Sequence, residues 1–491
     1  MNQFKRYVHD IIVFGVVMES WEVVVVGAGP AALRAAIESA DNGATTILID
    51  SLGIGSRQGK ATLSGIASSI CEVNSISHRD DTIAAGGEVT NSIMAAAICG
   101  ESVSIISQLE RWGLVFRRDR EGMPHTSKVP GHSKPRLTGC GDSSVREITR
   151  LLEEQVIKRK ITRKYDCAAI SLITDNQQIR GLTFLDILNG EVNAIQSKTV
   201  ILATEGYEGL WTTPSEGAGT GAALAAKAGI TLVGMSNFPI HPLTIKGTNI
   251  HMPVELLDSG GLLRKSNGDD ASFSDIINET CVLDLRELNS DSKIWFSNIL
   301  STIKNRTGLN IDVDVIPIRC SIITTGGIPI DYKSRATFND GKMWFTGLYA
   351  AGRSANTGMH GAGLLPGNIL LEDLFTGERA GAAASVWALD EEFNNSDLIQ
   401  IEQNNVRKEI QDLYLNDGKS VGQTSSAVTS LISKIEDNYN DKTLKSVNKN
   451  LSEINKNGIS LTDKSKVMNT ELLMAVQVKG LLTILTQIAS N

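Results

Sequence analysis

Gly27, Gly29 and Ala32 form a G-x-G-x-x-A turn, a spacing that surrounds a phosphate group with backbone amides. The turn follows the apolar segment Glu22–Val26 and opens an alanine-rich segment. The first glycine permits a tight turn, the second lets a pyrophosphate approach the backbone, and the small third residue keeps helix and strand close. Asp50 lies 23 residues after Gly27 (50 − 27), where an acid would accept hydrogen bonds from a ribose. The pattern predicts a dinucleotide-binding site.

The elements that must position this turn follow an α/β order. We expect a buried strand at Glu22–Val26, a helix from the turn to Asn42, and a second strand at Thr45–Asp50. Beyond about Asp390, apolar residues recur at helical spacing, which predicts a helical domain. Between these ends we expect strands at Cys167–Thr174, Arg180–Leu188 and Lys198–Thr204, and helices at Gly217–Ala228, near Ser292–Asn305, and at Ile369–Trp387.

Composition excludes several classes of protein. The 491 residues carry 47 basic and 55 acidic side chains, a net charge of −8, so we expect no nucleic-acid partner. The longest apolar runs, Ile11–Met18 and Val23–Val26, are far shorter than the roughly 20 residues of a membrane-spanning helix, so we expect no direct membrane span. The six cysteines never form C-x-x-C, which argues against a metal site. Met18 precedes the first clear strand, and we expect translation to begin there.

Three further segments narrow the interpretation. An apolar strand ends in Ala203-Thr204-Glu205-Gly206, a second runs over Gly347–Gly352, and Gly361–Asn368 is a glycine-rich helix entry. With these segments, the chain from Trp21 to its end resembles the flavoprotein subunit of the succinate dehydrogenase/fumarate reductase family, which includes L-aspartate oxidase and adenylylsulfate reductase. The likeness also includes His241-Pro242, Gly326-Gly327-Ile328, His360-Gly361-Ala362 and the tail segment Lys464–Leu473.

The resemblance implies an α/β fold, in which a Rossmann-like FAD-binding domain of the GR2 type is combined with an inserted α+β capping domain and a C-terminal helical domain. We expect the FAD-binding domain at 20–235 and 326–390, the capping domain at 236–325 and the helical domain at 391–491. It also implies an FAD-dependent oxidoreductase acting on CH–CH donors, with hydride transfer between a substrate C–C bond and flavin N5.

The FAD-binding residues are expected where the family motifs match. The family links FAD through a histidine after the second strand, but Ser56–Ile66 contains none, so we expect non-covalent FAD. Two acids that contact flavin in the family are changed, to Thr220 and Arg353. The expected cofactor-binding residues are Gly27, Ala28, Gly29, Pro30, Ala31, Ala32, Asp50, Ser51, Gly59, Lys60, Ala61, Thr62, Gly65, Ala203, Thr204, Gly206, Gly352, Arg353, Asn368, Ile369 and Leu370.

The substrate side departs further from the family. Arginines that grip a dicarboxylate are replaced by Asp258 and Leu364, the proton-donating arginine falls near Asn278, and a histidine falls near Ile322. The resemblance leaves His241, Glu255 and His360 as expected catalytic residues. Arg264, Arg319 and Arg353 are candidates to replace the lost guanidinium groups. We expect Glu205 to face solvent and His251 to be a solvated loop histidine.

Several functions stay open. The substrate is a small molecule, with a dicarboxylate among the candidates. Alternatives are a flavoenzyme for another substrate, such as an amino acid or a steroid-like enone, and a non-catalytic FAD-binding subunit that has lost the dicarboxylate site. The resemblance implies an iron–sulfur electron-transfer subunit as a partner. It also implies a cytoplasmic location, either free or attached to the inner face of the membrane through partner subunits.

Overall fold

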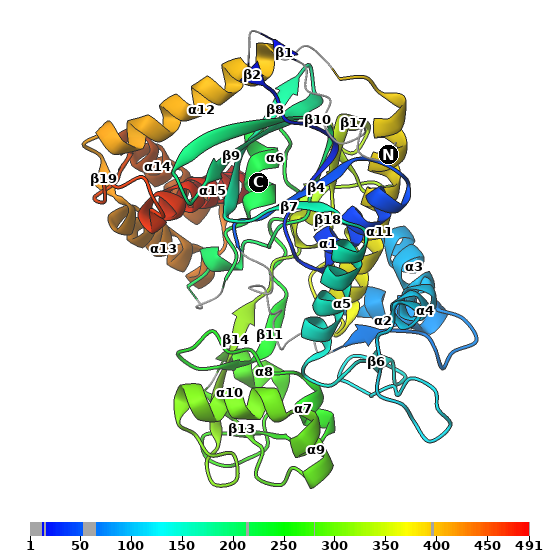
Figure 1. The fold of residues 1–491 in the computed structure, drawn as a ribbon. Helices are drawn as coiled ribbons and strands as arrows, with labels where there is room; N and C mark the ends of the chain where they lie inside the picture. Colours follow the sequence, from blue (N-terminus) through cyan, green and yellow to red (C-terminus); the bar gives the residue numbers. More distant parts are fainter. Residues whose placement is uncertain are drawn as a thin grey trace.

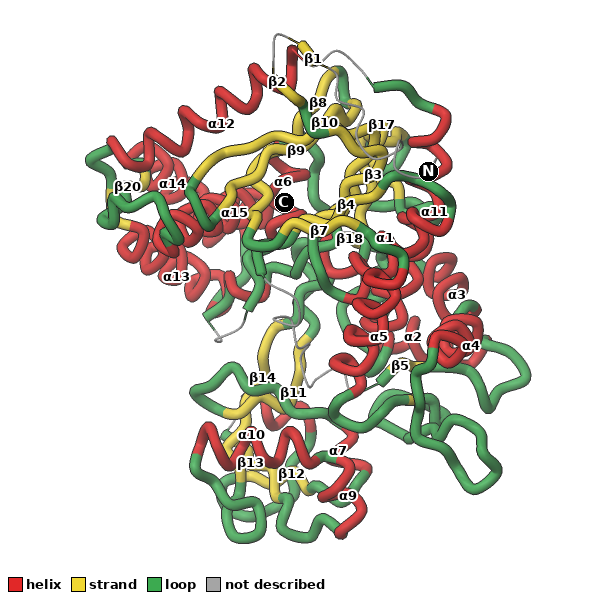
Figure 2. The backbone as a smooth tube through the Cα atoms, in the orientation of Figure 1, coloured by secondary structure: helices red, strands yellow, loops and turns green. Residues whose placement is uncertain are grey.

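The structure is a computed structural model that describes residues 12–13, 16–52, 65–212, 216–278, 280–393 and 397–490. Its largest part is a mixed sheet with helices on both faces. A smaller sheet with its own helices lies below this part in Figure 1, joined to it through β11 (Ile240–Ile245) and β14 (Ile316–Ile322). A group of C-terminal helices covers one side of the large sheet, as the red helices at the left of Figure 2 show.

The large sheet has eight strands among the described residues. Its central strands, in the order β17-β10-β3-β4-β7, are parallel. The valines of β3 are buried, which is typical of a parallel strand covered on both faces. The strands are β3 (Ser20–Val26), β4 (Thr46–Ile49), β7 (Thr162–Lys164), β8 (Cys167–Asp175), β9 (Gln178–Asp186), β10 (Glu191–Leu202), β16 (Arg335–Phe338) and β17 (Met343–Ala350).

The long strand β10 belongs to two pairings. Its first half, from Glu191 to Gln196, pairs antiparallel with β9, which in turn pairs antiparallel with β8. Its second half lies parallel between β3 and β17. The sequence predicted a strand only for this second half, because the first half carries polar residues such as Asn193 and Gln196. The predicted strand Cys167–Thr174 is β8, and the short strand β7 before it was not predicted.

Small residues join the helices on one face of the sheet. α1 (Pro30–Asp41) packs against α5 (Ser144–Lys158) and α11 (Asn368–Asp390). A Cβ at Gly377 would lie 2.4 Å from the carbonyl oxygen of Ala31, and one at Gly381 would lie 2.3 Å from that of Ala35. The backbones of α1 and α11 therefore touch, which larger side chains would prevent. The predicted helix at 369–387 is α11.

The opposite face is covered by α6 (Thr220–Lys227) and the C-terminal helices. The apolar spacing after Asp390 predicted these helices, and the structure has four of them among the described residues. They are α12 (Asp397–Leu415), α13 (Val421–Asp437), α14 (Asp441–Asn457) and α15 (Thr470–Ser490).

The smaller sheet is antiparallel, in the order β11-β14-β13-β12, and has its own apolar core. The predicted helix near 292–305 is two helices, because Phe296 leaves the helical conformation and is fully buried. The remaining elements of this part are β12 (Leu262–Lys265), β13 (Cys281–Asp284), α7 (Glu255–Asp258), α8 (Phe273–Asn278), α9 (Ser290–Trp295) and α10 (Ser297–Thr307).

Two helical stretches are long and apolar enough to cross a membrane by length and composition alone, 92–112 and 470–490. In each, 44% of the apolar window is buried. The first contains α3 (Ser92–Gly100) and α4 (Ser102–Trp112), which pack against α11, and the second is α15, which packs against α6, α13 and α14. Core helices of globular proteins meet the same criterion.

The other described elements are short or lie between these. They are α2 (Ile76–Gly86), β1 (Ile12–Val13), β2 (Val16–Val17), β5 (Ile66–Ala67), β6 (Leu137–Thr138), β15 (Ile328–Pro329), β18 (Ala355–Asn356), β19 (Lys419–Ser420), β20 (Ile459–Ser460), and the 3₁₀ turns η2 (Glu208–Leu210) and η3 (Gly352–Ser354).

Candidate active site

The phosphate turn joins β3 to α1. Gly27 has φ +124°, and a Cβ there would lie 2.2 Å from the carbonyl oxygen of Ala203, so only glycine fits. A Cβ at Gly29 would meet nothing within 4 Å, so open space adjoins the backbone there. Gly29 is the N-cap of α1, and no side chain caps this helix. The amides of its first turn and the positive end of its dipole are therefore available for an anion. The helix starts at Pro30. The small residues around this start are buried, namely Ala28, Ala31 and Ala32.

Four parallel strands end at this turn, and backbone hydrogen bonds connect their ends. The amide of Gly27 donates to Ile49 O, that of Ala203 to Val26 O, and that of Ala351 to Leu202 O, over 2.8–2.9 Å. Asp50 and Ser51 follow β4, Ala203 and Thr204 follow β10, and Gly352 follows β17. The expected cofactor residues from four separate segments therefore meet at one carboxyl edge, the place where open α/β sheets bind nucleotides.

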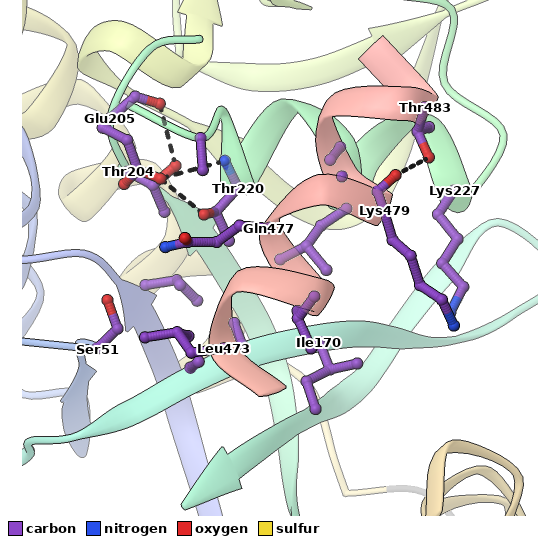
Figure 3. A pocket seen from close by; sticks show the side chains of 18 of the residues that line it. Ser51, Ile170, Thr204, Glu205, Thr220, Lys227, Leu473, Gln477, Lys479 and Thr483 are labelled. Carbon is purple, nitrogen blue, oxygen red and sulfur yellow. Dashed lines mark hydrogen bonds between the residues drawn. The ribbon is translucent and has the colours of Figure 1, made fainter. Parts of the chain in front are cut away.

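A cavity of about 510 Å³ begins at this edge, within the range of small-molecule sites. Gly27, Asp50, Ser51 and Thr204 line its beginning, and it continues between β8, α6 and α15. Figure 3 shows Thr204, Glu205 and Thr220 gathered at one end and the side chains of Lys227 and Lys479 at the other. The open space at Gly29, the uncapped helix and this cavity together fit the adenosine diphosphate end of FAD.

Glu205 was expected to face solvent, but it lines this cavity. Its Oε1 accepts hydrogen bonds from Thr220, at 2.7 Å from the hydroxyl and 3.4 Å from the amide. Thr204 Oγ1 accepts from the Gly221 amide at 2.8 Å, and the Thr204 amide donates to Ser354 Oγ at 2.8 Å. A carboxylate thus stands beside position 220, where the family has an aspartate, although it comes from a different residue.

The entry to α11 brings together further expected cofactor residues. The Ala67 amide, two residues after Gly65, donates to Gly367 O at 3.1 Å, directly before Asn368, Ile369 and Leu370. The side chain of Asn368 is fully buried. Its Oδ1 lies 2.8 Å from His78 Nε2, and its Nδ2 donates a hydrogen bond to Thr82 Oγ1. The Asn368 amide also donates to Leu365 O, at 3.2 Å, so the polar groups of this residue mainly fix the start of α11. Burial lowers the pKa of His78 to about 4, so it is neutral at physiological pH.

Two further expected cofactor residues, Gly206 and Arg353, are engaged in contacts within the protein. Gly206 is packed closely, with a Cβ there 2.5 Å from Thr324 Oγ1. Arg353 forms an ion pair with Glu208, Nη2 to Oε1 at 2.6 Å, and also donates to Thr324 O. The predictions for Gly59, Lys60, Ala61 and Thr62 lie outside the described residues.

His241 and Glu255 lie on the part built around the smaller sheet. His241 is buried on β11, and its Nε2 lies 3.0 Å from Met252 O, which can only accept, so Nε2 carries a proton. Glu255 begins α7 three residues after Met252 and is 5% exposed. Burial, with Asp142 nearby, raises the pKa of Glu255 to about 8. Glu255 therefore holds its proton at neutral pH.

His360 lies on the FAD-binding side. Its Nε2 is 2.8 Å from Glu372 Oε2, and its Nδ1 is buried with no hydrogen-bond partner among the described residues. Burial alone would raise the pKa of Glu372, but His360 and the Thr357 hydroxyl hold it below its usual value. His360 is therefore held in one orientation by a buried carboxylate.

The expectation for His251 was wrong. This histidine is 8% exposed, and its Nδ1 lies 2.9 Å from Thr244 Oγ1 and 3.2 Å from Ser321 Oγ. Its ring packs edge-on against His241, with centroids 5.7 Å apart. The sequence around His251 gave no sign of this contact, which forms because the segment after β11 folds back and His251 pairs with Thr244.

The positions at which the resemblance would place arginine or histidine carry no cationic side chain here. Asp258 ends α7, Ile322 ends β14, and Leu364 lies between His360 and α11. Among the candidate arginines, Arg264 pairs with the buried Asp284 and the exposed Asp270. Arg353 pairs with Glu208, as described above. For Arg319, on β14, the Nε and Nη2 atoms have no hydrogen-bond partner among the residues that the structure describes.

Comparison with known proteins agrees with this geometry. The family model described as "FAD binding domain" matches residues 22–293 and 275–370. The succinate dehydrogenase flavoprotein subunit of Rickettsia bellii is 24% identical, over 96% of this chain and 87% of that protein. L-aspartate oxidase of Agrobacterium fabrum is 30% identical, over 73% of this chain and 72% of that protein. A variant of E. coli quinol fumarate reductase has the same fold, with TM-score 0.87 and 22% identity, covering 96% of this chain and 89% of that one.

Proposed function

The chain belongs to the FAD binding domain family, as a divergent relative of succinate dehydrogenase flavoproteins and L-aspartate oxidases, and we propose that it transfers hydride between a C–C bond of a small carboxylate and FAD. The observation that carries this proposal is the meeting of Gly27, Asp50, Ala203 and Gly352 at one sheet edge beside the uncapped start of α1. Bound FAD supplies the hydride acceptor at N5.

The residues of this chain have separate tasks in the proposal. The first turn of α1 holds the pyrophosphate, and Asp50 and Ser51 hold the ribose. His360, fixed by Glu372, and the backbone at the start of α11 hold the flavin ring. The part that carries β11 and α7 covers the ring, excludes water and presents His241 and the protonated Glu255 to the substrate.

We propose non-covalent FAD and a substrate of the succinate or fumarate type. Support comes from the absence of histidine in Ser56–Ile66 and from the carboxylates after which the relatives are named. The test is the visible flavin spectrum of the purified, FAD-loaded chain under anaerobic conditions. Succinate should bleach it, or fumarate should restore colour after chemical reduction. A flavin that responds to neither excludes these substrates.

A second candidate is a non-catalytic FAD-binding subunit. Asp258 and Leu364 favour it, since two guanidinium groups that would grip a dicarboxylate are absent. Each charge-assisted bond contributes about 1.5–3 kcal/mol, so their loss weakens such a site strongly unless another cation replaces them. A flavin that stays unreduced with every small acid tried, in a chain that co-purifies with other subunits, would favour this candidate.

For the partners, we propose an iron–sulfur electron-transfer subunit, because the Rickettsia relative is a "flavoprotein subunit". The proposed location is cytoplasmic, with attachment to the inner face of the membrane through that partner. Affinity purification of the native complex, followed by iron analysis and membrane fractionation, tests both points. A chain that is recovered alone, without iron, would contradict them.

A further inference from the structure

The cavity beside the phosphate turn is bounded on one side by the C-terminal helix α15. The residues of α15 that line it include Leu473, Gln477 and Thr483. The same cavity begins at Gly27 and Asp50, next to the places proposed for the pyrophosphate and the ribose of FAD. The base that follows the ribose must therefore enter space that α15 helps to form.

Close packing against α6 fixes the position of α15. A Cβ at Gly480 would lie 3.3 Å from the Cβ of Ala223 and 4.0 Å from the carbonyl oxygen of Ala218, so the two helices nearly touch there. Gln477 precedes Gly480 by three residues, and residues three apart share one face of a helix. The contact at Gly480 therefore holds Gln477 over the cavity, one turn nearer to the start of α15.

The carboxamide of Gln477 points to the cofactor end of the cavity. Figure 3 shows its half-buried side chain extending from α15 toward the end that holds Thr204 and Thr220. Those residues are already bonded, because Thr220 donates to Glu205 and Thr204 Oγ1 accepts from the Gly221 amide. Within the described part of the chain, no hydrogen bond joins the carboxamide of Gln477 to another residue. Its donor and its acceptor are both available for a ligand.

Apolar side chains from three elements line the cavity around this carboxamide. They are Ala169 and Ile170 of β8, Ala223 of α6, and Val476 of α15. Such walls suit the faces of a flat ring. Adenine has apolar faces and an edge on which the N6 amine donates beside a ring nitrogen that accepts, and the carboxamide of glutamine matches this edge with two hydrogen bonds.

We propose that Gln477 binds the adenine base of FAD, so that the C-terminal helix is part of the cofactor site and selects an adenine nucleotide. The carboxamide oxygen accepts from the N6 amine, and the carboxamide nitrogen donates to the adjacent ring nitrogen. The inference rests on the proposed function only because it needs FAD in the cavity. It requires neither hydride transfer nor a particular substrate.

Fluorescence titration of the full chain with FAD and with etheno-FAD tests the proposal. In etheno-FAD a two-carbon bridge joins N1 and N6 of the adenine, so the amine can no longer donate, while the flavin, the pyrophosphate and the ribose are unchanged. We expect Gln477→Leu to weaken FAD binding roughly 5- to 100-fold and to leave the affinity for etheno-FAD nearly unchanged. Gln400→Leu is the matched control, because Gln400 is exposed on α12 and does not line the cavity. This variant should bind both flavins as the wild type does.

Equal losses for the two flavins in Gln477→Leu, or no loss for FAD, overturn the proposal. If Gln477→Leu does not fold, hydrogen–deuterium exchange of the wild-type chain replaces it. FAD should then protect the α15 peptide around Gln477 more strongly than saturating FMN, which lacks the adenosine, and equal protection overturns the proposal. A flavin that responds to neither succinate nor fumarate, in a chain whose preference for FAD depends on Gln477, would reject the proposed reaction and leave the adenine contact standing.

Discussion

The carboxylate Oδ2 of Asp142 accepts a 2.7 Å hydrogen bond from the backbone amide of Ile299, which links the loop before α5 to the first turn of α10. Asn298 donates to the same carboxylate through Nδ2 at 3.2 Å. Nearby, the guanidinium of Arg117 lies over the ring of Trp295, 4.5 Å from its centroid. The two parts thus meet at the start of α10 in the smaller-sheet part, where Asp142 of the large-sheet part accepts a hydrogen bond from a free amide of the first turn.

Asp142→Ala should loosen this contact. A hydrogen bond to a charged group contributes about 1.5–3 kcal/mol, so amides in the first turn of α10 should exchange roughly ten or more times faster. Hydrogen–deuterium exchange with mass spectrometry measures this. Asp270→Ala, an acid of the smaller-sheet part whose side chain is 91% exposed, is the control. Equal exchange in both variants would show that the Asp142 bond does not hold the two parts together.

Gly29→Ala should leave the fold intact and weaken FAD binding. Its φ of −79° suits alanine, and the added Cβ meets no protein atom within 4 Å, so it enters the open space beside the turn. We expect an unchanged Tm of the FAD-free chain and a Kd for FAD at least about tenfold higher. Gly27→Ala should instead unfold the apo chain at lower temperature, because its Cβ would clash with Ala203 O. A Gly29→Ala chain that binds FAD normally would be evidence against the pyrophosphate site.

Glu255 should make stability depend on pH. Its pKa in the folded chain is about 8, above the ordinary 4.5, so the folded state binds more protons than the unfolded state between these values. The free energy of unfolding should therefore fall as pH rises through this window. Urea unfolding at about pH 6 and about pH 8.5 should show a smaller difference for Glu255→Gln than for the wild type. Asp270→Asn is the control. If Glu255 also donates a proton in the reaction, kcat/KM should fall above about pH 8.

Arg353 and Glu208 should behave as a coupled pair. Their side chains are 17% and 8% exposed, and removal of one buried partner leaves the other charge uncompensated. Arg353→Met should cost about 3–5 kcal/mol of unfolding free energy, and Arg353→Met with Glu208→Gln should cost less than the sum of the two single changes. Urea unfolding of all four proteins measures the coupling. Additive effects would mean that the two side chains stabilise the fold independently.

Acid precipitation should separate the flavin from the protein. Without a histidine in Ser56–Ile66, no residue of the family's attachment site can form the covalent link. We expect the flavin absorbance in the supernatant and a colourless pellet. A yellow pellet that keeps its colour after washing would reveal a covalent attachment at another residue.

The sequence predicted those parts of the site that depend on short segments. The phosphate turn was recognisable because Gly27 and Gly29 have a fixed spacing after an apolar strand. The helices α1 and α11 were recognisable from their small and apolar residues. The expected domain limits at 235/236, 325/326 and 390/391, and the roles assigned to the site residues, stay predictions.

The other parts depend on contacts between distant segments, which periodicity does not encode. Glu205 contacts Thr220 across a turn, Glu208 contacts Arg353 from 145 residues away, and His251 contacts Ser321 from 70 residues away. Asp142 was not singled out at all, because its role depends on a helix start 157 residues later. No local pattern announces such contacts.

The docking of α1 onto α11 also sets an order of events during synthesis. Arg34 on α1 bonds Glu378 on α11, 344 residues later, beside the glycines that let the two backbones touch. The helix that carries the phosphate turn therefore reaches its final position only after the ribosome has released the chain beyond residue 380. The segment with the smaller sheet, whose strands all lie between 240 and 322, can fold earlier on local contacts. We therefore expect flavin loading to be a late step, which follows the folding of the smaller sheet.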